Sequence, residues 1–162
     1  MSKRKDSGFT LIELMIVTEI IAIMAAIAVP NMMRLRIQSN HAAAVGNLAT
    51  VVKAQAAFAH AERGYAGTWD ALRDDPLAKG QPAYLDNDFA GGAVSGYTYT
   101  IAPSGSSVKT SSGVAGSADF NAWADPFSAG KMGSGIYHYF VDASGVIRFD
   151  KDAQANGDSE VL

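Results

Sequence analysis

The chain has 162 residues and a net charge of −3, with 48% hydrophobic and 18% charged residues. This length corresponds to one domain with a short extra segment, which excludes a large multidomain enzyme. The absence of cysteine excludes a disulfide framework, a cysteine-based zinc site and a thiol nucleophile. The mild acidity provides no clustered basic face, so nucleic acid is not the default partner.

The first predicted element is an apolar helix over residues 9–29. Its polar positions are confined to Thr10, Glu13, Thr18 and Glu19. A helix of this length spans roughly 30 Å at ~1.5 Å per residue, which is about the thickness of the hydrocarbon core of a bilayer. The pattern therefore predicts a membrane-spanning helix.

Three basic residues, Lys3, Arg4 and Lys5, precede the apolar segment. Such a flank normally stays in the cytoplasm, so we expect a single pass through a membrane with the N-terminus inside. A secretory signal peptide is the alternative, because small residues near the end of the segment imitate a cleavage site. The apolar run exceeds the about 7 to 15 residues of a signal peptide, and it contains two carboxylates, so the membrane span is favoured.

Glu13 is unusual inside such a helix. An acidic side chain at mid-helix costs ~2.5 kcal/mol or more on insertion scales, so an intramembrane Glu is a functional-site candidate that needs a partner. The alternative is a hydrated carboxylate near the interface, because Glu13 lies close to the start of the helix.

The segment from Gly8 to Leu14 reads GFTLIEL, follows a short basic leader, and precedes an apolar run that ends in AIAVPN at residues 26–31. This signature resembles the N-terminus of type IV pilins and type II secretion pseudopilins, and the resemblance covers roughly residues 3–60. It implies that a prepilin peptidase removes a leader of residues 1–8 by cutting between Gly8 and Phe9. It also implies that Phe9 becomes the N-methylated first residue.

The resemblance further implies that the Glu13 carboxylate meets the Phe9 amine of a neighbouring subunit during assembly. Opposite charges attract strongly where water is scarce, but each must first be desolvated, so the pair sets register more than it adds stability. Pro30 lacks an N–H, and its ring opposes the carbonyl of Ala26, so we expect the helix to kink or loosen there. In related filaments this stretch is locally unwound.

Glu19, with Thr18 beside it, departs from the family pattern, in which an apolar residue is usual. The two acids Glu13 and Glu19 lie about 240° apart around a helix, so they cannot both serve one amine. Four interpretations remain for Glu19: it is protonated, it bonds Thr18, it bonds a cation on another subunit, or it marks a different packing.

Residues 31–62 continue as an amphipathic helix rich in alanine, and we expect one helix from about Phe9 to Glu62. Residues 9–30 form its membrane-spanning or filament-core half, and the second half packs on a sheet. Its predicted apolar stripe consists of Val45, Leu48, Val52, Ala56 and Ala59. Gly64 is suited to a left-handed C-cap.

Residues 63–162 are predicted to form a globular head with an antiparallel sheet of about four strands, which gives the α+β pilin fold. A long connection over residues 65–88 contains a short helix at Trp69–Arg73. The strands are expected at 96–101, 119–124, 136–141 and 146–149, with the last two joined as a hairpin through residues 142–145. The tail Asp150–Leu162 is polar and predicted to be frayed.

We predict no metal and no cofactor. The sequence segments 150–152 and 156–158 place acidic oxygens at short spacing, and some pseudopilins bind calcium near this end. However, the register and terminal Glu of an EF-hand loop are missing, so a solvated acidic tail is favoured over calcium. His41, His60 and His138 have no i, i+4 pair, and the sequence contains no hydrolase, zinc-protease or Walker motif.

The favoured function is a pilin that polymerises with copies of itself into an extracellular type IV pilus after leader cleavage and N-methylation. Its expected partners are the prepilin peptidase and an inner-membrane assembly platform. The first alternative is the major pseudopilin of type II secretion. The second is a minor pilin that acts as an adhesin or DNA-uptake protein at the tip, and a membrane-anchored enzyme ranks last because no catalytic set is visible.

Overall fold

The computed structural model describes residues 8–73, 83–85, 93–130 and 133–162. The basic leader residues 3–5 and most of the predicted connection after residue 73 lie outside these ranges. The chain divides into two compact units, residues 1–35 and residues 36–162. Helix α1, Leu11–Glu62, has 52 residues and contributes to both units. The predicted long helix is therefore confirmed, and α1 remains helical through Pro30 in the isolated chain.

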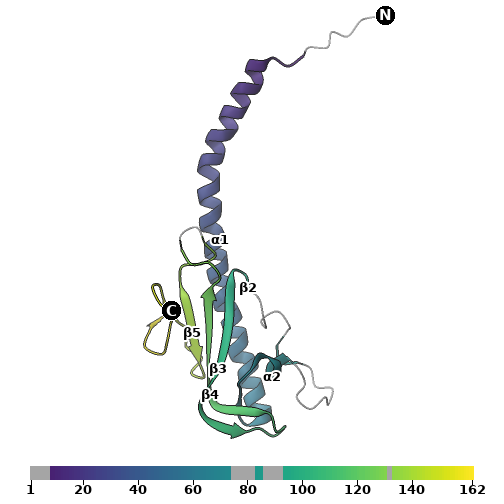
Figure 1. Cartoon of the computed structure of the whole chain (residues 1–162), viewed down its shortest axis with the longest axis vertical. Helices are drawn as coiled ribbons and strands as arrows, with labels where there is room; N and C mark the ends of the chain where they lie inside the picture. The colour runs from purple at the N-terminus through teal and green to yellow at the C-terminus, as the bar shows by residue number, and fades with distance from the viewer. Residues whose placement is uncertain (1–7, 74–82, 86–92, 131–132) are drawn as a thin grey trace, which may run out of the picture. The chain divides into compact units, whose positions relative to one another are not determined.

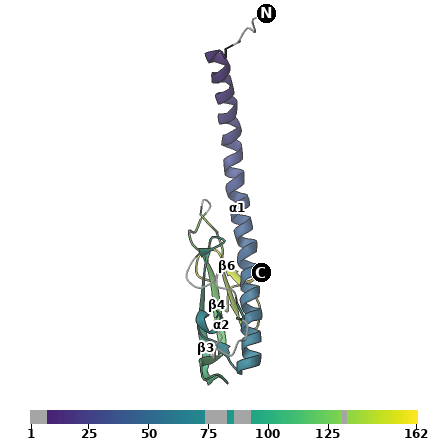
Figure 2. The same cartoon turned by 90° about the vertical axis from the view of Figure 1, so that its right-hand side faces the viewer.

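In the second unit, the C-terminal half of α1 lies along one face of the sheet (Figure 1, Figure 2). The buried residues of α1 lie mostly three or four positions apart and are Ile37, Ala44, Leu48, Val51, Ala54, Gln55 and Phe58. The predicted stripe is confirmed in part: Leu48 is buried, and Val45 and Val52 pack against the core. Ala56 is exposed, and Val45, Val52 and Ala59 are only partly buried. The error arose because a polar residue, Gln55, lies at the centre of the buried face.

Gln55 is fully buried, and both ends of its amide are hydrogen-bonded to one residue. Its Nε2 donates to the carbonyl of Ala66 at 2.9 Å, and its Oε1 accepts the Ala66 N–H at 2.9 Å. The Gln55 amide thus binds the backbone of strand β1, Tyr65–Ala66, through the same pair of bonds that a residue of a neighbouring strand would form. A buried polar residue is tolerated here because its hydrogen-bonding groups are satisfied.

Replacing Gln55 with leucine is expected to lower the free energy of unfolding by about 2 to 4 kcal/mol, because it leaves the N–H and C=O of Ala66 buried without partners. The change is measured by urea denaturation of the purified protein in detergent, followed by tryptophan fluorescence. Thr50→Ala on the exposed side of the same helix serves as the matched control and should change stability by less than about 0.5 kcal/mol. Equal stability of the Gln55→Leu variant and the unmodified chain would contradict this role.

The end of α1 is formed by Arg63 rather than by Gly64. Arg63 adopts φ of 64°, and its N–H donates to the Ala59 carbonyl at 2.9 Å. The prediction of a left-handed Gly64 was therefore wrong by one residue. Gly64 is instead packed closely, because a Cβ added there would lie 3.3 Å from Cγ1 of Val108. The constraint on Gly64 thus comes from tertiary packing and not from its own backbone angle.

Within the described residues the sheet has seven antiparallel strands, so the prediction of about four was too low. The predicted strands fall in β3 Tyr97–Lys109, β4 Ala115–Pro126, β5 His138–Asp142 and β6 Arg148–Asp150. The additional strands have two residues each: β1, β2 Ala93–Val94 and β7 Glu160–Val161. The order is β2-β3-β4-β5-β6-β7, and β1 pairs with β4. Helix α2, Trp69–Arg73, confirms the predicted short helix.

The hairpin between β5 and β6 is confirmed. Its register pairs Tyr139 with Phe149, and the Gly145 N–H donates to the Asp142 carbonyl at 3.0 Å. Gly145 has φ of 74°, in the left-handed region that favours glycine. The turn residues in the sequence therefore specified this connection locally.

The C-terminal tail is ordered, which contradicts the prediction of a frayed segment. Ala155 is buried, and its carbonyl accepts the Trp123 Nε1–H at 3.0 Å. Gln154 Nε2 donates to Asp125 Oδ2 at 2.8 Å, and β7 pairs with β6. The tail is thus held by side chains of β4, which are far away in sequence.

His41 ties α1 to the segment before β5. Its Nε2 accepts the Ile136 N–H at 3.1 Å, and its ring packs edge-on against Tyr97, Tyr137 and Tyr139. Burial lowers the pKa of His41. Burial raises the pKa of Tyr139 to about 12, so Tyr139 stays neutral at physiological pH.

The head is expected to lose stability as the pH falls below about 6.5, the ordinary pKa of His in an unfolded chain. Because the pKa of His41 is lower in the folded state, the unfolded chain binds more protons below that pH, and protonation also removes the acceptor for Ile136. Above about 6.5 this contribution is constant. Urea midpoints at pH 5 and pH 7.5 measure the effect, and His41→Gln should flatten the difference. An unchanged slope in that variant would assign the pH dependence to another group.

Candidate functional site

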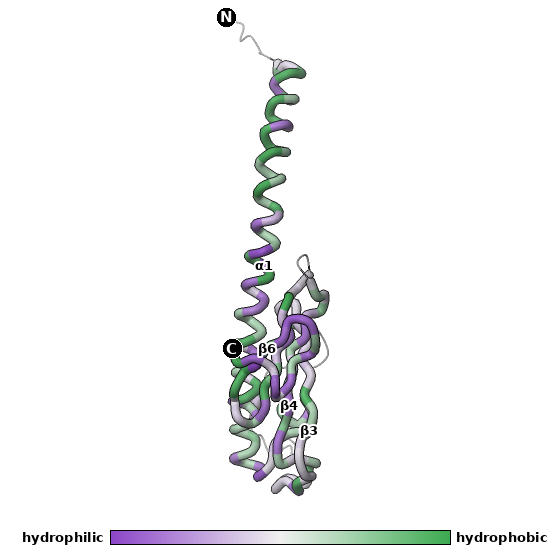
Figure 3. Tube along the Cα trace, turned by 90° about the vertical axis from the view of Figure 1, so that its left-hand side faces the viewer, coloured by the Kyte–Doolittle hydropathy of each residue, from purple (hydrophilic) through white to green (hydrophobic). Residues whose placement is uncertain are grey.

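The first unit presents an apolar helix surface that the chain itself does not cover. Every residue from Gly8 to Met32 is exposed. The exposed residues include large apolar side chains on every side of the segment. Phe9, for example, is 81% exposed and Leu11 is 76% exposed. Figure 3 shows hydrophobic residues dominating this part of α1. A helix that is apolar all round is normally buried in a membrane or among other helices.

The same part of α1 contains a stretch that is long and apolar enough to cross a membrane, judged by length and composition. Its mean hydropathy over eighteen residues is 2.4. This finding agrees with the predicted span at residues 9–29.

Glu13 and Thr10 together begin the helix. The Glu13 carboxylate accepts the Thr10 backbone N–H at 3.0 Å and the Thr10 hydroxyl at 2.9 Å. In return, Thr10 Oγ1 accepts the Glu13 N–H at 3.3 Å. This reciprocal pair is a capping box, which satisfies backbone donors that have no partner inside the helix.

The capping box holds the Glu13 carboxylate beside the start of the helix, close to Phe9. One oxygen of the carboxylate, Oε2, accepts both bonds from Thr10. Thr10 was not among the predicted site residues, although a Thr followed by Glu three residues later before an apolar run is a recognised signal for a helix start. Glu13 therefore has a local structural role in the isolated chain in addition to any contact with another subunit.

Thr18 and Glu19 do not bond each other. The Thr18 hydroxyl donates to the Met15 carbonyl at 2.9 Å, and the exposed Glu19 carboxylate forms no hydrogen bond or ion pair with the described residues. The interpretation in which Glu19 bonds Thr18 is therefore wrong for the isolated chain. Glu13 and Glu19 remain separate acids in different surroundings.

The remaining predicted residues of the N-terminal region are Gly8, Phe9 and Pro30. Gly8 and Phe9 precede α1, and no heavy atom lies within 4 Å of a Cβ added to Gly8. Both residues are exposed. Pro30 is exposed inside α1 and provides no backbone donor to the helix.

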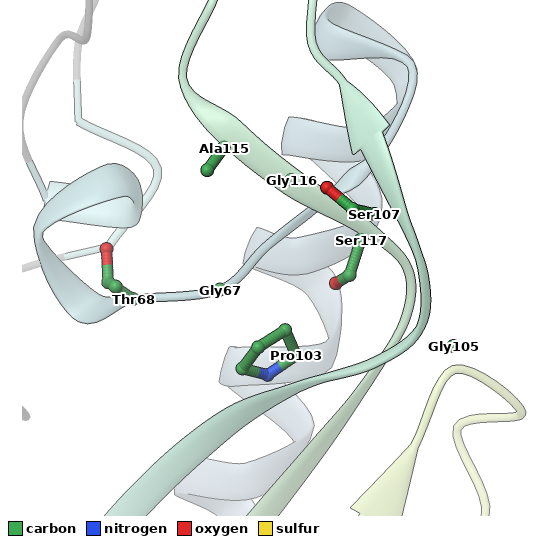
Figure 4. Close-up of a pocket in the computed structure, with 8 residues that line it drawn as sticks. All are labelled: Gly67, Thr68, Pro103, Gly105, Ser107, Ala115, Gly116 and Ser117. Carbon is green, nitrogen blue, oxygen red and sulfur yellow. The ribbon is translucent and has the colours of Figure 1, made fainter.

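A pocket of about 330 Å³ lies in the head between the turn after β1, the second half of β3 and the start of β4 (Figure 4). Its lining consists of small or hydroxyl-bearing residues and one proline: Gly67, Thr68, Pro103, Gly105, Ser107, Ala115, Gly116 and Ser117. None of these side chains is an acid, a base or an imidazole. The lining therefore supplies no general acid or base for catalysis.

Side-chain oxygens in the tail accept hydrogen bonds from backbone N–H groups two or three residues later. The Asp150 carboxylate accepts the N–H groups of Asp152 and Ala153 at 2.9 and 3.3 Å, and these bonds lower the pKa of Asp150. Asn156 Oδ1 accepts the Asp158 N–H at 2.8 Å. Among the residues that the structure describes, no three His, Asp or Glu side chains are grouped as metal ligands.

Comparison with known proteins places the N-terminal motif in a family. A model of the prokaryotic N-terminal methylation motif matches residues 3–29. The chain is 33% identical over 105 residues to the type IV wide pilus major component PilA4 of Thermus thermophilus, and the match covers 65% of this chain and 79% of that protein. The chain belongs to the type IV pilin and pseudopilin family.

Two other members of the pilin family are matched over a smaller share of their length. The chain is 48% identical over 54 residues to the type IV major pilin protein PilA of Myxococcus xanthus, which is 33% of this chain and 24% of that protein. It is 33% identical over 93 residues to the type II secretion system core protein G of Aeromonas hydrophila, which is 55% of this chain and 65% of that protein. No solved structure gives a significant match.

Proposed function

We propose that this chain is a pilin, a structural subunit that polymerises with copies of itself into an extracellular type IV pilus. The observation that carries the proposal is the apolar segment of residues 8–32, in which every residue is exposed and the Thr10–Glu13 capping box begins the helix. Burying one Leu, Ile or Phe side chain contributes about 1.5 to 3 kcal/mol. Copies of the helix packed together would bury many such side chains, which gives a strong driving force for assembly.

The proposed processing site is the bond between Gly8 and Phe9. Glycine at the first position imposes no side chain on the peptidase, and Gly8, Phe9 and Thr10 are exposed. Cleavage there creates a new α-amine on Phe9, which is then methylated. The basic residues 3–5 keep the leader in the cytoplasm before cleavage, so the subunit crosses the inner membrane once with its N-terminus inside.

Assembly then brings the Phe9 amine of one subunit to the Glu13 carboxylate of another. Thr10 supports this step because its two hydrogen bonds already fix the carboxylate at the helix start. A pre-positioned group loses less conformational entropy when it binds. The work of the chain is therefore assembly rather than catalysis, with the inner-membrane platform and the prepilin peptidase as its other partners.

The proposal is tested by the mass of the mature protein together with its location. We expect loss of residues 1–8, a gain of one methyl group, and recovery of the chain as the abundant subunit of fibres sheared from the cell surface. A mature protein that retains its first eight residues and is absent from sheared fibres would refute the proposal.

The major pseudopilin of type II secretion is the second candidate, supported by the similarity to the Aeromonas core protein G. It shares the same processing, so mass alone does not separate the two. A chain that is processed but absent from sheared surface fibres, and whose deletion blocks export of secreted proteins, would favour the pseudopilin. Stabilisation of the head by calcium would favour it further.

A further inference from the structure

We propose that Glu19 forms an ion pair with Arg34 of a second copy of this chain, and that this pair fixes the lengthwise offset between two packed helices. The inference rests on the proposed polymerisation. The contact differs from the one between Glu13 and the Phe9 amine. It gives a role to Glu19, which takes no part in the capping box.

Glu19 is the acid of the first unit that lacks a partner among the described residues. It is exposed on a helix stretch of high hydropathy, and the neighbouring Thr18 hydroxyl is engaged by the Met15 carbonyl. Glu19 lies ten residues after Phe9, roughly 15 Å along the helix. That position is near the middle of an apolar layer about 30 Å thick, where an unpaired carboxylate is most costly.

Arg34 is the cationic side chain of the described part of the first unit, residues 8–35. It is exposed and forms no ion pair with the described residues. Arg34 lies fifteen residues after Glu19, roughly 22 Å along the helix, so the two side chains of one copy cannot meet. The unpaired acid and the unpaired base can combine only between copies.

The first two cations that follow Glu19 along the helix, Arg34 and Arg36, are exposed. At ~100° per residue, Arg34 is about 60° from Glu19 around the helix axis. Arg36, the next cation, is about 100° away on the other side of Glu19 and does not share a face with Arg34. Arg34 belongs to the same unit as Glu19, whereas Arg36 belongs to the second unit. A neighbouring helix that meets Arg34 does not meet Arg36, so Arg36 provides a matched control.

If α1 keeps the continuous helix that it has in the isolated chain, parallel copies form this pair when one is displaced by fifteen residues toward its own C-terminal end. The contact of Glu13 with a neighbouring Phe9 amine spans only four residues, roughly 6 Å. The two contacts therefore involve different neighbours of the same subunit. Because a desolvated ion pair adds little net stability, the pair between Glu19 and Arg34 specifies register among otherwise uniform apolar surfaces.

Cysteine cross-linking tests the contact directly, because the natural chain has no cysteine. The side chains of an ion pair keep the two Cα atoms farther apart than a disulfide allows, about 4.4 to 6.8 Å. The variant Glu19→Cys/Arg34→Cys is therefore treated in intact filaments with a short bifunctional thiol reagent. We expect a ladder of covalent multimers from this variant and monomers from each single variant and from Glu19→Cys/Arg36→Cys.

A charge exchange keeps the inference testable if the cysteine variant does not assemble. Glu19→Arg and Arg34→Glu should each lower the filament yield by about tenfold or more, since each leaves like charges facing each other. The combined variant Glu19→Arg/Arg34→Glu should return to within about threefold of the unmodified yield, whereas Glu19→Arg/Arg36→Glu should not.

The outcomes separate this inference from the proposed function. If the unmodified chain forms filaments but shows neither the ladder nor the rescue, the pair between Glu19 and Arg34 is overturned and polymerisation stands. Full assembly of Glu19→Gln together with failed rescue overturns the pair in the same way. If the unmodified chain forms no filaments under any condition of expression, the proposed function itself fails.

Discussion

Replacing Glu13 with alanine or glutamine should reduce filament yield by about 100-fold or more while leaving cleavage after Gly8 intact. The expected loss follows from the charge. Without the carboxylate, the Phe9 amine of a neighbouring subunit enters a water-poor environment without a counter-ion. Yield is measured as sheared filaments per cell, and cleavage as the mass of the membrane-bound protein.

The two substitutions at Glu13 separate its local role from its role between subunits. Glutamine retains an oxygen that can accept the Thr10 N–H, so the capping box survives without the charge. Thr10→Val is the complementary control, because it removes the hydroxyl bond but keeps the carboxylate. We expect Glu13→Gln to fail like Glu13→Ala and Thr10→Val to retain much of the yield. If Glu13→Gln assembles normally, helix capping rather than charge is the function of Glu13.

Truncating Phe58 to alanine should lower the free energy of unfolding of the head by about 3 to 5 kcal/mol. Phe58 is fully buried on α1, and its ring meets Tyr84 edge-on with centroids 5.6 Å apart. The substitution removes these contacts and leaves a cavity between α1 and the sheet. Since a domain has a total stability of about 5 to 15 kcal/mol, a loss of this size removes a large part of it.

The Phe58 prediction is measured by urea denaturation, because both tryptophans, Trp69 and Trp123, lie in the second unit and report on its unfolding. Phe127→Ala is the matched control. The Phe127 side chain is 74% exposed, so its truncation should change stability by less than about 0.5 kcal/mol. Similar losses for both variants would mean that the packing of α1 on the sheet does not dominate the stability of the head.

Several parts of the fold were predictable from the sequence because their causes are local. The apolar run and the alanine-rich continuation predicted α1 to within two residues of its start, and α2 was predicted with its observed bounds. The hairpin turn at residues 142–145 was identified by Asp and Gly at positions that a tight turn requires. The pilin motif at Gly8–Leu14 is likewise a continuous stretch, and the family comparison confirmed the resemblance.

Other features depended on partners far away in the chain and could not be predicted. Gln55 looks like a solvent-facing residue until β1 supplies both hydrogen bonds to it. The tail looked frayed because nothing in residues 150–162 indicates that Trp123 binds the Ala155 carbonyl. Strands of two residues, such as β2 and β7, are shorter than any pattern that alternation can reveal.

The sequence by itself determined that this chain has a long apolar helix with an acid near its start, because helix formation and membrane partition depend on residues within a few turns of each other. Only the tertiary structure decided which face of α1 is buried and how the sheet is extended. It also showed that the Glu19 carboxylate has no partner among the described residues. The physical reason is that burial and hydrogen-bond satisfaction are properties of contacts, and most of these contacts join residues that the sequence separates.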